Sequence, residues 1–285
     1  TELYCLFLLV LAGTAVYWPV VLHKAIPMAV DHALLLAPWE EARPLDMNHA
    51  QAPDASVHTT QFFPWYRYLH EAAQNNQSIL WDPYENCGMP FLALWKSRCL
   101  SPFSIPVYFL PLNYALQISI LARILVAGLC AYYVARRLGI SAPMALLVGV
   151  SYELSAPVFL WSGWPLSDSA PWLPLLVLFA ERIVMGQYRQ WAAGALPVVL
   201  MLLGGSSECA VGGVVFLLIY VTLRSVMLKR DRAAGVSAAV SIATALIVAI
   251  GAAAVQLLPY IEFAGKAAAT ETTPTLLQWQ DAIRL

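Results

Sequence analysis

The chain has 285 residues, of which 60% are hydrophobic and 12% are charged, and its formal net charge is −1. Its mean hydropathy of +0.66 excludes a soluble globular domain and predicts an integral membrane protein. The near-neutral charge excludes nucleic acid as a partner, because no basic stripe is present to neutralise phosphates.

Seven apolar segments are predicted to cross the membrane as helices. About 20 apolar residues are needed to span a hydrocarbon core of about 30 Å, and the first segment, 3–22, has this length. The other crossings are expected at residues 114–135, 142–160, 168–185, 190–203, 209–227 and 233–258. We therefore predict an all-α membrane protein with a single module over residues 1–285. Because the chain starts without a methionine and stops just after an amphipathic stretch, we expect it to be part of a longer protein.

The segment between the first two crossings, residues 23–113, is too polar and too rich in proline to cross the membrane. Within it, residues 61–73 have aromatic side chains at helical spacing and predict a helix lying in the interface. The short turns between the later crossings are dense in basic residues, which by the positive-inside rule places them in the cytoplasm. Those residues are Arg136, Arg137, Arg182, Arg189, Arg224, Lys229, Arg230 and Arg232. The long loop and the tail, 259–285, are thus expected on the extracytoplasmic side.

Five cysteines are scattered along the chain without a Cys-x-x-Cys pair. Their spacing predicts neither a metal knuckle nor a disulfide framework. Cys87 and Cys99 share the long loop, so a bond between them stays open.

A family resemblance rests on motifs of the long loop and of the later crossings. In the loop they are Gln61-Phe62-Phe63-Pro64-Trp65, Trp81-Asp82-Pro83-Tyr84, Gly88-Met89-Pro90-Phe91-Leu92-Ala93, Ser97 and Pro102. Further along they are Arg137-Leu138-Gly139-Ile140-Ser141, Trp172-Leu173-Pro174-Leu175 before Glu181-Arg182, and Leu258-Pro259. Their order and spacing resemble the YfhO-like family of bacterial membrane proteins, which belong to the GT-C class of lipid-sugar glycosyltransferases. The chain departs from the pattern at three points: Asp82 replaces a more usual Asn, Lys96 a Gln, and Val57-His58 an acidic position.

The resemblance implies a GT-C-like fold in the bacterial cytoplasmic membrane. It also implies an inverting transfer of a sugar from a polyprenyl-phosphate donor to an extracytoplasmic acceptor of the cell envelope. In GT-C enzymes a carboxylate of the first outer loop acts as general base on the acceptor hydroxyl. Asp54 is our first choice for this base, and the competitors are Asp31, Asp46, Glu40 and Glu41. Any of these residues is alternatively a solvated loop acid or a turn former.

Other loop residues are candidates for assisting the base and for binding the sugar. His58 either assists the base or is a surface hydrogen-bonding residue. Gln61 precedes an aromatic cluster that offers ring faces to a sugar, or else an aromatic belt to the lipid interface. The cluster consists of Phe62, Trp65, Tyr66 and Tyr68, and we assign Trp81 and Asp82 to the same substrate-binding set.

Cationic candidates for holding the lipid phosphate lie in the loop and in the second crossing. Lys96 and Arg98 follow the Gly88-Met89-Pro90 corner, and both are alternatively ordinary loop cations. Arg123 lies about 13 Å below the outer surface, at a depth that roughly matches that of Glu153 in the third crossing. Charges at such depths are usually paired, so we predict that Arg123 and Glu153 approach each other. Arg123 would hold the lipid phosphate near the loop, or the pair would only lock two helices.

Two acidic residues lie near the outer ends of later crossings. Glu208 follows Gly204-Gly205 at the outer mouth and is either a substrate contact or part of a tight turn. Asp168 is predicted to cap the fourth crossing.

Three classes of function compete on this evidence. The first is a membrane glycosyltransferase, and the second is a non-catalytic GT-C-like subunit that packs against other membrane subunits of a larger complex. A transporter is weaker, because polarity is concentrated in one outer loop instead of in repeated halves. No metal ligand set or other cofactor is assigned, and a divalent metal ion stays open.

Overall fold

The computed structural model describes residues 2–22, 28, 31–35, 37–44, 56–85 and 87–271. Over these residues the chain is helical and contains no β-strand, which confirms the predicted all-α class. The α-helices are α1 (Glu2–Leu22), α2 (Phe63–Gln74), α3 (Ile105–Phe109), α4 (Leu112–Arg137), α5 (Ala142–Glu153), α6 (Leu166–Ser169), α7 (Leu173–Val184), α8 (Trp191–Leu203), α9 (Ser207–Met227), α10 (Arg232–Ala252) and α11 (Ala254–Glu271).

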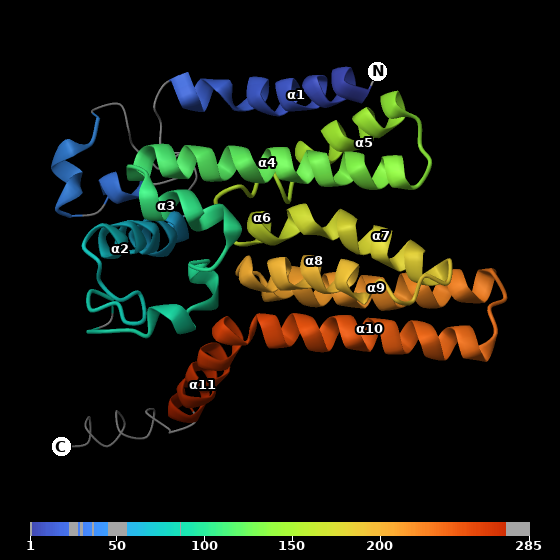
Figure 1. The fold of residues 1–285 in the computed structure, drawn as a ribbon. Helices are drawn as coiled ribbons and strands as arrows, with labels where there is room; N and C mark the ends of the chain where they lie inside the picture. The colour runs from blue at the N-terminus through green and yellow to red at the C-terminus, as the bar shows by residue number, and fades with distance from the viewer. Residues whose placement is uncertain are drawn as a thin grey trace, which may run out of the picture.

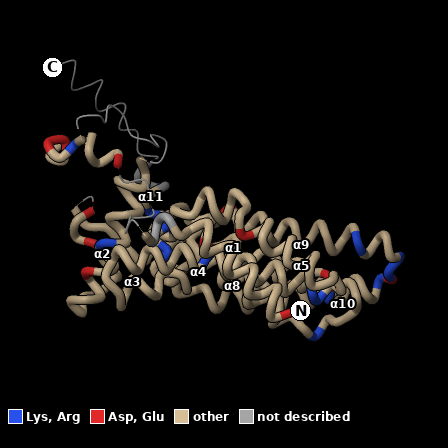
Figure 2. The backbone as a smooth tube through the Cα atoms, turned by 90° about the horizontal axis from the view of Figure 1, so that it is seen from above, with Lys and Arg blue, Asp and Glu red and all other residues tan. Residues whose placement is uncertain are grey.

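The long helices lie side by side in one bundle, with the elements of the long loop at one end (Figure 1). Helix α4 packs against α1, α5 and α7, and α8 packs against α9 and α10. The loop end carries α2, α3 and several short 3₁₀ turns, and the opposite end, which we call the short-turn end, carries the α4–α5, α7–α8 and α9–α10 turns. Figure 2 shows Lys and Arg at that short-turn end and also at the loop end, near α2 and α11.

Three helices among the described residues are long and apolar enough to cross a membrane: α4, α9 and α10. Residues 2–18 of α1 and the whole of α8 are apolar but shorter. Large apolar side chains remain exposed on the outer faces of α9 and α10, including Val211, Ile219, Val240 and Ile247. In water such an apolar surface would be costly, and in a bilayer it is the surface that contacts lipid.

Helix bounds agree with the apolar segments in some places and depart from them in others. Helix α4 covers the predicted segment 114–135, and α9 covers 209–227. The predicted segment 142–160 is wrong in its second half, because α5 ends at Glu153 and residues 154–165 form turns. Prolines at positions 157 and 165 disfavour helix at the preceding residues. The predicted segment 233–258 breaks at Ala253, and α11 departs at an angle from α10 (Figure 1).

An aromatic core fixes the long loop to the end of the bundle. Its buried members include Phe62, Trp65, Tyr66 and Leu69 from one helical stretch, together with Phe91 from a 3₁₀ turn. The predicted helix over residues 61–73 is confirmed as α2, which is preceded by one turn of π-helix, His58–Phe62. Helix α2 contacts α3, which contacts the start of α4. The loop is therefore a packed layer over the helix ends.

Candidate functional site

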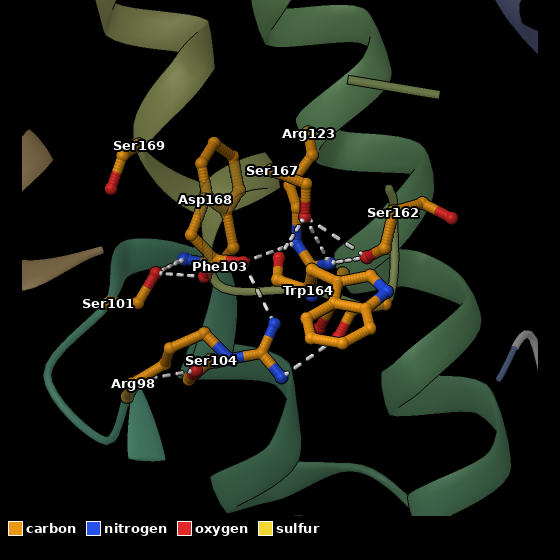
Figure 3. Close-up of polar contacts among 12 residues, drawn as sticks. Arg98, Ser101, Phe103, Ser104, Arg123, Ser162, Trp164, Ser167, Asp168 and Ser169 are labelled. Atoms are coloured by element: carbon orange, nitrogen blue, oxygen red, sulfur yellow. Dashed lines mark hydrogen bonds and ion pairs between the residues drawn. The ribbon is translucent and has the colours of Figure 1, made fainter. Parts of the chain in front are cut away.

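A group of charged residues is buried where the loop meets the bundle, and we call Arg98, Ser101, Arg123 and Asp168 the polar centre (Figure 3). One oxygen of Asp168 lies 3.3 Å from Nη1 of Arg98 and 3.1 Å from Nε of Arg123. The other oxygen accepts a hydrogen bond from Ser101 at 2.5 Å. The three charged residues are at most 2% exposed. One carboxylate thus joins the loop, α4 and α6.

Backbone geometry brings Arg98 to this position. Arg98 ends the 3₁₀ turn Trp95–Ser97 with φ of 58°, in the left-handed region. Gly205 packs directly against it, because a Cβ on Gly205 would lie 2.7 Å from Cγ of Arg98. Gly205 itself has φ of +83°, which an L side chain rarely adopts. A glycine at this position lets the α8–α9 turn approach the arginine.

The polar centre holds two guanidinium groups against one carboxylate, and protein groups surround the excess positive charge. Arg98 donates to the carbonyl of Gly163 at 3.3 Å, and its guanidinium lies 5.2 Å from the ring centroid of Phe62 and 4.8 Å from that of Tyr66. Ring faces attract cations electrostatically. The space around Arg98 is therefore filled by side chains.

Arg123 is likewise surrounded by protein acceptors. It donates to the carbonyl of Ser162, to the hydroxyl of Ser167 at 3.2 Å and to the hydroxyl of Tyr66 at 3.3 Å. Residues 154–165 are not helical, so the Ser162 carbonyl is free to face Arg123 (Figure 3). The described contacts thus give both arginines partners within the protein.

The predicted approach of Arg123 to Glu153 is wrong, since Arg123 pairs with Asp168. Asp168 is not a simple helix cap either, because its carboxylate is shared by two arginines. Glu153 is buried at the end of α5, and neither of its carboxylate oxygens has a hydrogen-bond partner among the described residues. It lies against small residues: a Cβ on Gly128 would be 2.3 Å from its Oε2, and one on Gly13 3.5 Å.

A second region lies on the outer surface of the loop and forms a cavity of about 500 Å³, which we call the loop cavity. Its lining combines aromatic rings with charged groups: Thr60, Pro64, Trp65, Arg67, Tyr68, Glu71, Asp82, Tyr84 and Glu85. Trp65 Nε1 donates to Glu85 at 2.5 Å, and Arg67 pairs with Glu71 at 2.7 Å. Ring faces beside carboxylates are the groups that sugars use for C–H contacts and hydroxyl hydrogen bonds.

A tight loop shapes one wall of this cavity. The backbones of Asp82 and Met89 exchange two hydrogen bonds, and the Asp82 carboxylate accepts from the amide of Tyr84 at 2.9 Å. Gly88 has φ of +115° and lies on the ring of Trp81, where a Cβ would come within 2.6 Å. The Tyr68 hydroxyl donates to the carbonyl of Trp81 at 2.7 Å. Burial, with the nearby Asp82, raises the pKa of Tyr68.

A smaller crevice of about 190 Å³ adjoins the loop cavity, and Trp65 lines both. Its other lining residues are Ala93, Leu94, Trp95, Lys96, Gly205, Ser207, Tyr260 and Phe263. Lys96 lies 4.0 Å from Glu208, with both side chains more than half exposed. The crevice therefore offers an accessible cation beside aromatic rings.

Other predicted site residues lie apart from these cavities. Gln61 and Trp81 are exposed and line neither the loop cavity nor the crevice. His58 is buried against Trp164, with ring centroids 5.3 Å apart, so its interpretation as a surface residue is wrong. Burial and the charge of Arg98 lower the pKa of His58.

The predicted acids of the early loop are dispersed. Asp31 begins the 3₁₀ turn Asp31–Leu35, and Glu40 and Glu41 lie exposed in another, Trp39–Ala42. Asp54, the first choice for the base, and Asp46 lie outside the described residues.

Sequence reasoning missed two acidic residues, Glu71 and Glu85, and it gave Asp168 only a capping role instead of a place in the polar centre. A signal for Asp168 was present, since Ser167-Asp168-Ser169 is a polar triplet between two apolar segments. Glu85 directly follows the Trp81-Asp82-Pro83-Tyr84 motif, and Glu71 lies four residues after Arg67 on one helix face.

The described residues include no group of three His, Cys, Asp or Glu side chains able to hold a metal ion. All five cysteines are free thiols, so the pairing left open between Cys87 and Cys99 does not form. Cys99 is buried, which raises the pKa of its thiol.

Residues 55–282 match the family described as bacterial membrane protein YfhO. Comparisons with curated proteins and with solved structures give no match. The family match extends from the long loop to α11 and beyond, and it includes the polar centre, the loop cavity and the crevice. The chain therefore belongs to the YfhO family of bacterial membrane proteins.

Proposed function

We propose that this chain is a membrane glycosyltransferase that transfers a sugar from a polyprenyl-phosphate donor to an extracytoplasmic acceptor. The observation that carries the proposal is the loop cavity, where Trp65, Tyr68 and Tyr84 lie beside three carboxylates in a space of about 500 Å³. A hexose, with hydroxyls around an apolar ring, matches this mixture of ring faces and acceptors.

The adjoining crevice supports a sugar phosphate as the ligand. Trp65 lines both spaces, and Lys96 lines the crevice. A sugar in the loop cavity would thus have a cation within reach of its phosphate, and an ammonium group is a common phosphate partner. Arg98 and Arg123 are not proposed as phosphate ligands, because protein groups surround both.

The transfer needs a general base and a stabilised leaving group. A carboxylate removes the proton of the acceptor hydroxyl. The hydroxyl oxygen bonds to the anomeric carbon as the bond between that carbon and the phosphate oxygen breaks. Polyprenyl phosphate leaves, with its charge stabilised by Lys96. Asp54 remains the base that the resemblance implies. Glu85 is the competitor that the loop cavity offers, since it already accepts a hydrogen bond there.

The arrangement in the membrane belongs to the same proposal. We place seven crossings across the bacterial cytoplasmic membrane, with the long loop outside and the basic short turns inside. The basic residues at the short-turn end support this orientation (Figure 2). Cysteine accessibility labelling in intact cells tests it: a probe that does not cross the membrane should modify Cys87, which is exposed in the loop.

Activity is tested with the chain in lipid nanodiscs, a labelled polyprenyl-phosphate hexose and a bacterial envelope extract as acceptor. Release of polyprenyl phosphate should require the chain, and loss of the base should reduce it by about a hundredfold or more. Asp54→Asn and Glu85→Gln are compared with Glu262→Gln, an exposed acid of α11 that lines neither the loop cavity nor the crevice. The variant with the large loss identifies the base.

A non-catalytic subunit is the second candidate, and the polar centre favours it. The region where Arg98 and Arg123 were expected to meet a lipid phosphate is filled by protein side chains. A scaffold would show no change in melting temperature with the labelled donor, whereas a ligand at a hundred times its Kd stabilises by about 2.7 kcal/mol. A folded chain without that response would overturn the enzyme proposal.

A further inference from the structure

A cationic cavity of about 680 Å³ opens at the short-turn end, where α4, α7, α8 and α9 meet. Its lining residues are Arg137, Leu138, Leu178, Glu181, Arg182, Met185, Gln187, Gln190 and Arg224. The helix ends and turns that supply these residues lie at the other end of the bundle from the loop (Figure 1). It is therefore separate from the site proposed for sugar transfer.

The charges of this cavity are unbalanced. Arg224 lies 3.4 Å from the carboxylate of Glu181, which neutralises one arginine. Arg182 donates to the amide oxygen of Gln190 at 2.8 Å, and Arg137 lies 5.0 Å from the ring centroid of Tyr133. Neither Arg137 nor Arg182 has a carboxylate partner among the described residues. The lining thus has an excess of two positive charges, which favours an anion.

An apolar groove of about 630 Å³ begins beside the cationic cavity, and Leu138 lines both. It runs between α4, α5, α7 and α9 toward the loop end, past Tyr152 and Phe216 to Leu166 and Cys209. None of its described lining residues is charged. Gly212 borders open space, because a Cβ placed there would meet no atom within 4 Å. The groove has the lining that an acyl chain requires.

We propose that the cationic cavity and the apolar groove together bind one anionic phospholipid. The phosphate lies among Arg137, Arg182 and Arg224, and an acyl chain follows the groove from Leu138 toward Cys209. Guanidinium groups suit a phosphate because they donate paired hydrogen bonds, and basic pockets between membrane helices bind anionic head groups. The groove has no charge at its loop end, which fixes the head group at the short-turn end.

Lipid binding is measured by native mass spectrometry of the whole chain and by its melting temperature in neutral detergent. The probes are phosphatidylglycerol, phosphatidylcholine and water-soluble glycerol phosphate. Phosphatidylglycerol should remain bound and raise the melting temperature, and phosphatidylcholine should not. Glycerol phosphate without chains should bind at least tenfold more weakly, since the groove then contributes nothing. Equal binding of glycerol phosphate would identify a free-phosphate site and overturn the lipid proposal.

Variants separate the two halves of the site. Arg137→Gln and Arg182→Gln should each weaken the binding of phosphatidylglycerol by about tenfold, because each variant loses one charge-assisted hydrogen bond. Arg230→Gln is the matched control, because this exposed arginine lies in the α9–α10 turn outside the cavity. Gly212→Leu adds an apolar side chain where a Cβ meets no atom within 4 Å, and it should weaken the binding of phosphatidylglycerol but not that of glycerol phosphate. Unchanged lipid binding in Arg182→Gln and Gly212→Leu, with melting temperatures intact, would refute the site.

Discussion

Two regions near the loop end use charged residues in opposite ways. In the polar centre, Arg98, Arg123 and Asp168 are buried and surrounded by protein donors, acceptors and rings. In the loop cavity, the more exposed Glu71 and Glu85 line a space of about 500 Å³ that no side chain fills. Buried charges with protein partners indicate a structural role, and charges beside unfilled space indicate recognition. The difference supports a structural role for the first region and is consistent with the ligand binding that we propose for the second.

The largest expected effect is in the polar centre. Asp168→Asn leaves two buried guanidinium groups without a counter-charge, and breaking a buried pair in this way costs about 3–5 kcal/mol. We expect a large loss of monodisperse protein in detergent and a large fall in melting temperature. Glu208→Gln is the control, because its contact with Lys96 is exposed, and exposed pairs contribute about 0–1 kcal/mol. If both variants melt like the wild type, Asp168 does not hold the loop to the bundle.

Glu153 is a second buried carboxylate, and it provides the opposite case to Asp168. It is fully buried like Asp168, but its oxygens have no hydrogen-bond partner among the described residues. Leaving a polar group buried and unsatisfied costs about 1–3 kcal/mol, so Glu153→Met should raise the melting temperature. Glu153→Gln keeps the unsatisfied polar atoms and should change it little. A fall in melting temperature with Glu153→Met would show that the carboxylate has a partner in the membrane.

Apolar length predicted part of the fold correctly, because a long run of apolar residues has few alternatives to a membrane helix. The bounds of α4 and α9 agree with the predicted segments within two residues. Residues 154–160 are also mostly apolar, yet they and the residues up to 165 form turns, in which the carbonyls of Ser162 and Gly163 accept hydrogen bonds from Arg123 and Arg98. Such distant side-chain donors are invisible to a local pattern of hydrophobicity.

The candidate site was predicted less well than the fold. Equal depth in the membrane suggested that Arg123 would meet Glu153, but depth does not specify which way a residue faces around its helix. Glu153 faces Gly128, while Arg123 faces α6, which carries Asp168. The aromatic residues of α2 were identified, and two of them, Trp65 and Tyr68, line the loop cavity. Glu71 lies on the same helix, whereas Glu85 joins them only through the folding of the segment that follows Trp81.

Tyr84 tests the loop cavity without disturbing the core. Its side chain is 80% exposed, and it lines the cavity beside Tyr68. Tyr84→Ser removes one ring face, and we expect donor binding to weaken about tenfold, or 1.4 kcal/mol, with an unchanged melting temperature. Phe109→Ser is the matched control, since Phe109 is 77% exposed but lies on α3 outside the cavity. Equal donor binding in both variants would remove the cavity as the sugar site.

The smallest expected effect is a dependence of stability on pH through His58, which lies beside the polar centre. Burial, and secondly the charge of Arg98, lower the pKa of His58 below the ordinary value of 6.5. The folded chain therefore binds fewer protons at this site than the unfolded chain as pH falls through about 6.5. The free energy of unfolding should decrease over that range.

His58→Gln is neutral at every pH, so its melting temperature should fall less than that of the wild type between pH 7.5 and pH 5.5, conditions chosen to bracket a value of about 6.5. The readout is the slope against pH, because the substitution also removes ring contacts with Phe62 and Trp164 and lowers stability at all pH values. Parallel slopes would mean that His58 accepts a proton in the folded chain as easily as in the unfolded one. Neither the burial of the imidazole nor the charge of Arg98, which Asp168 offsets, would then disfavour its protonation in the folded chain.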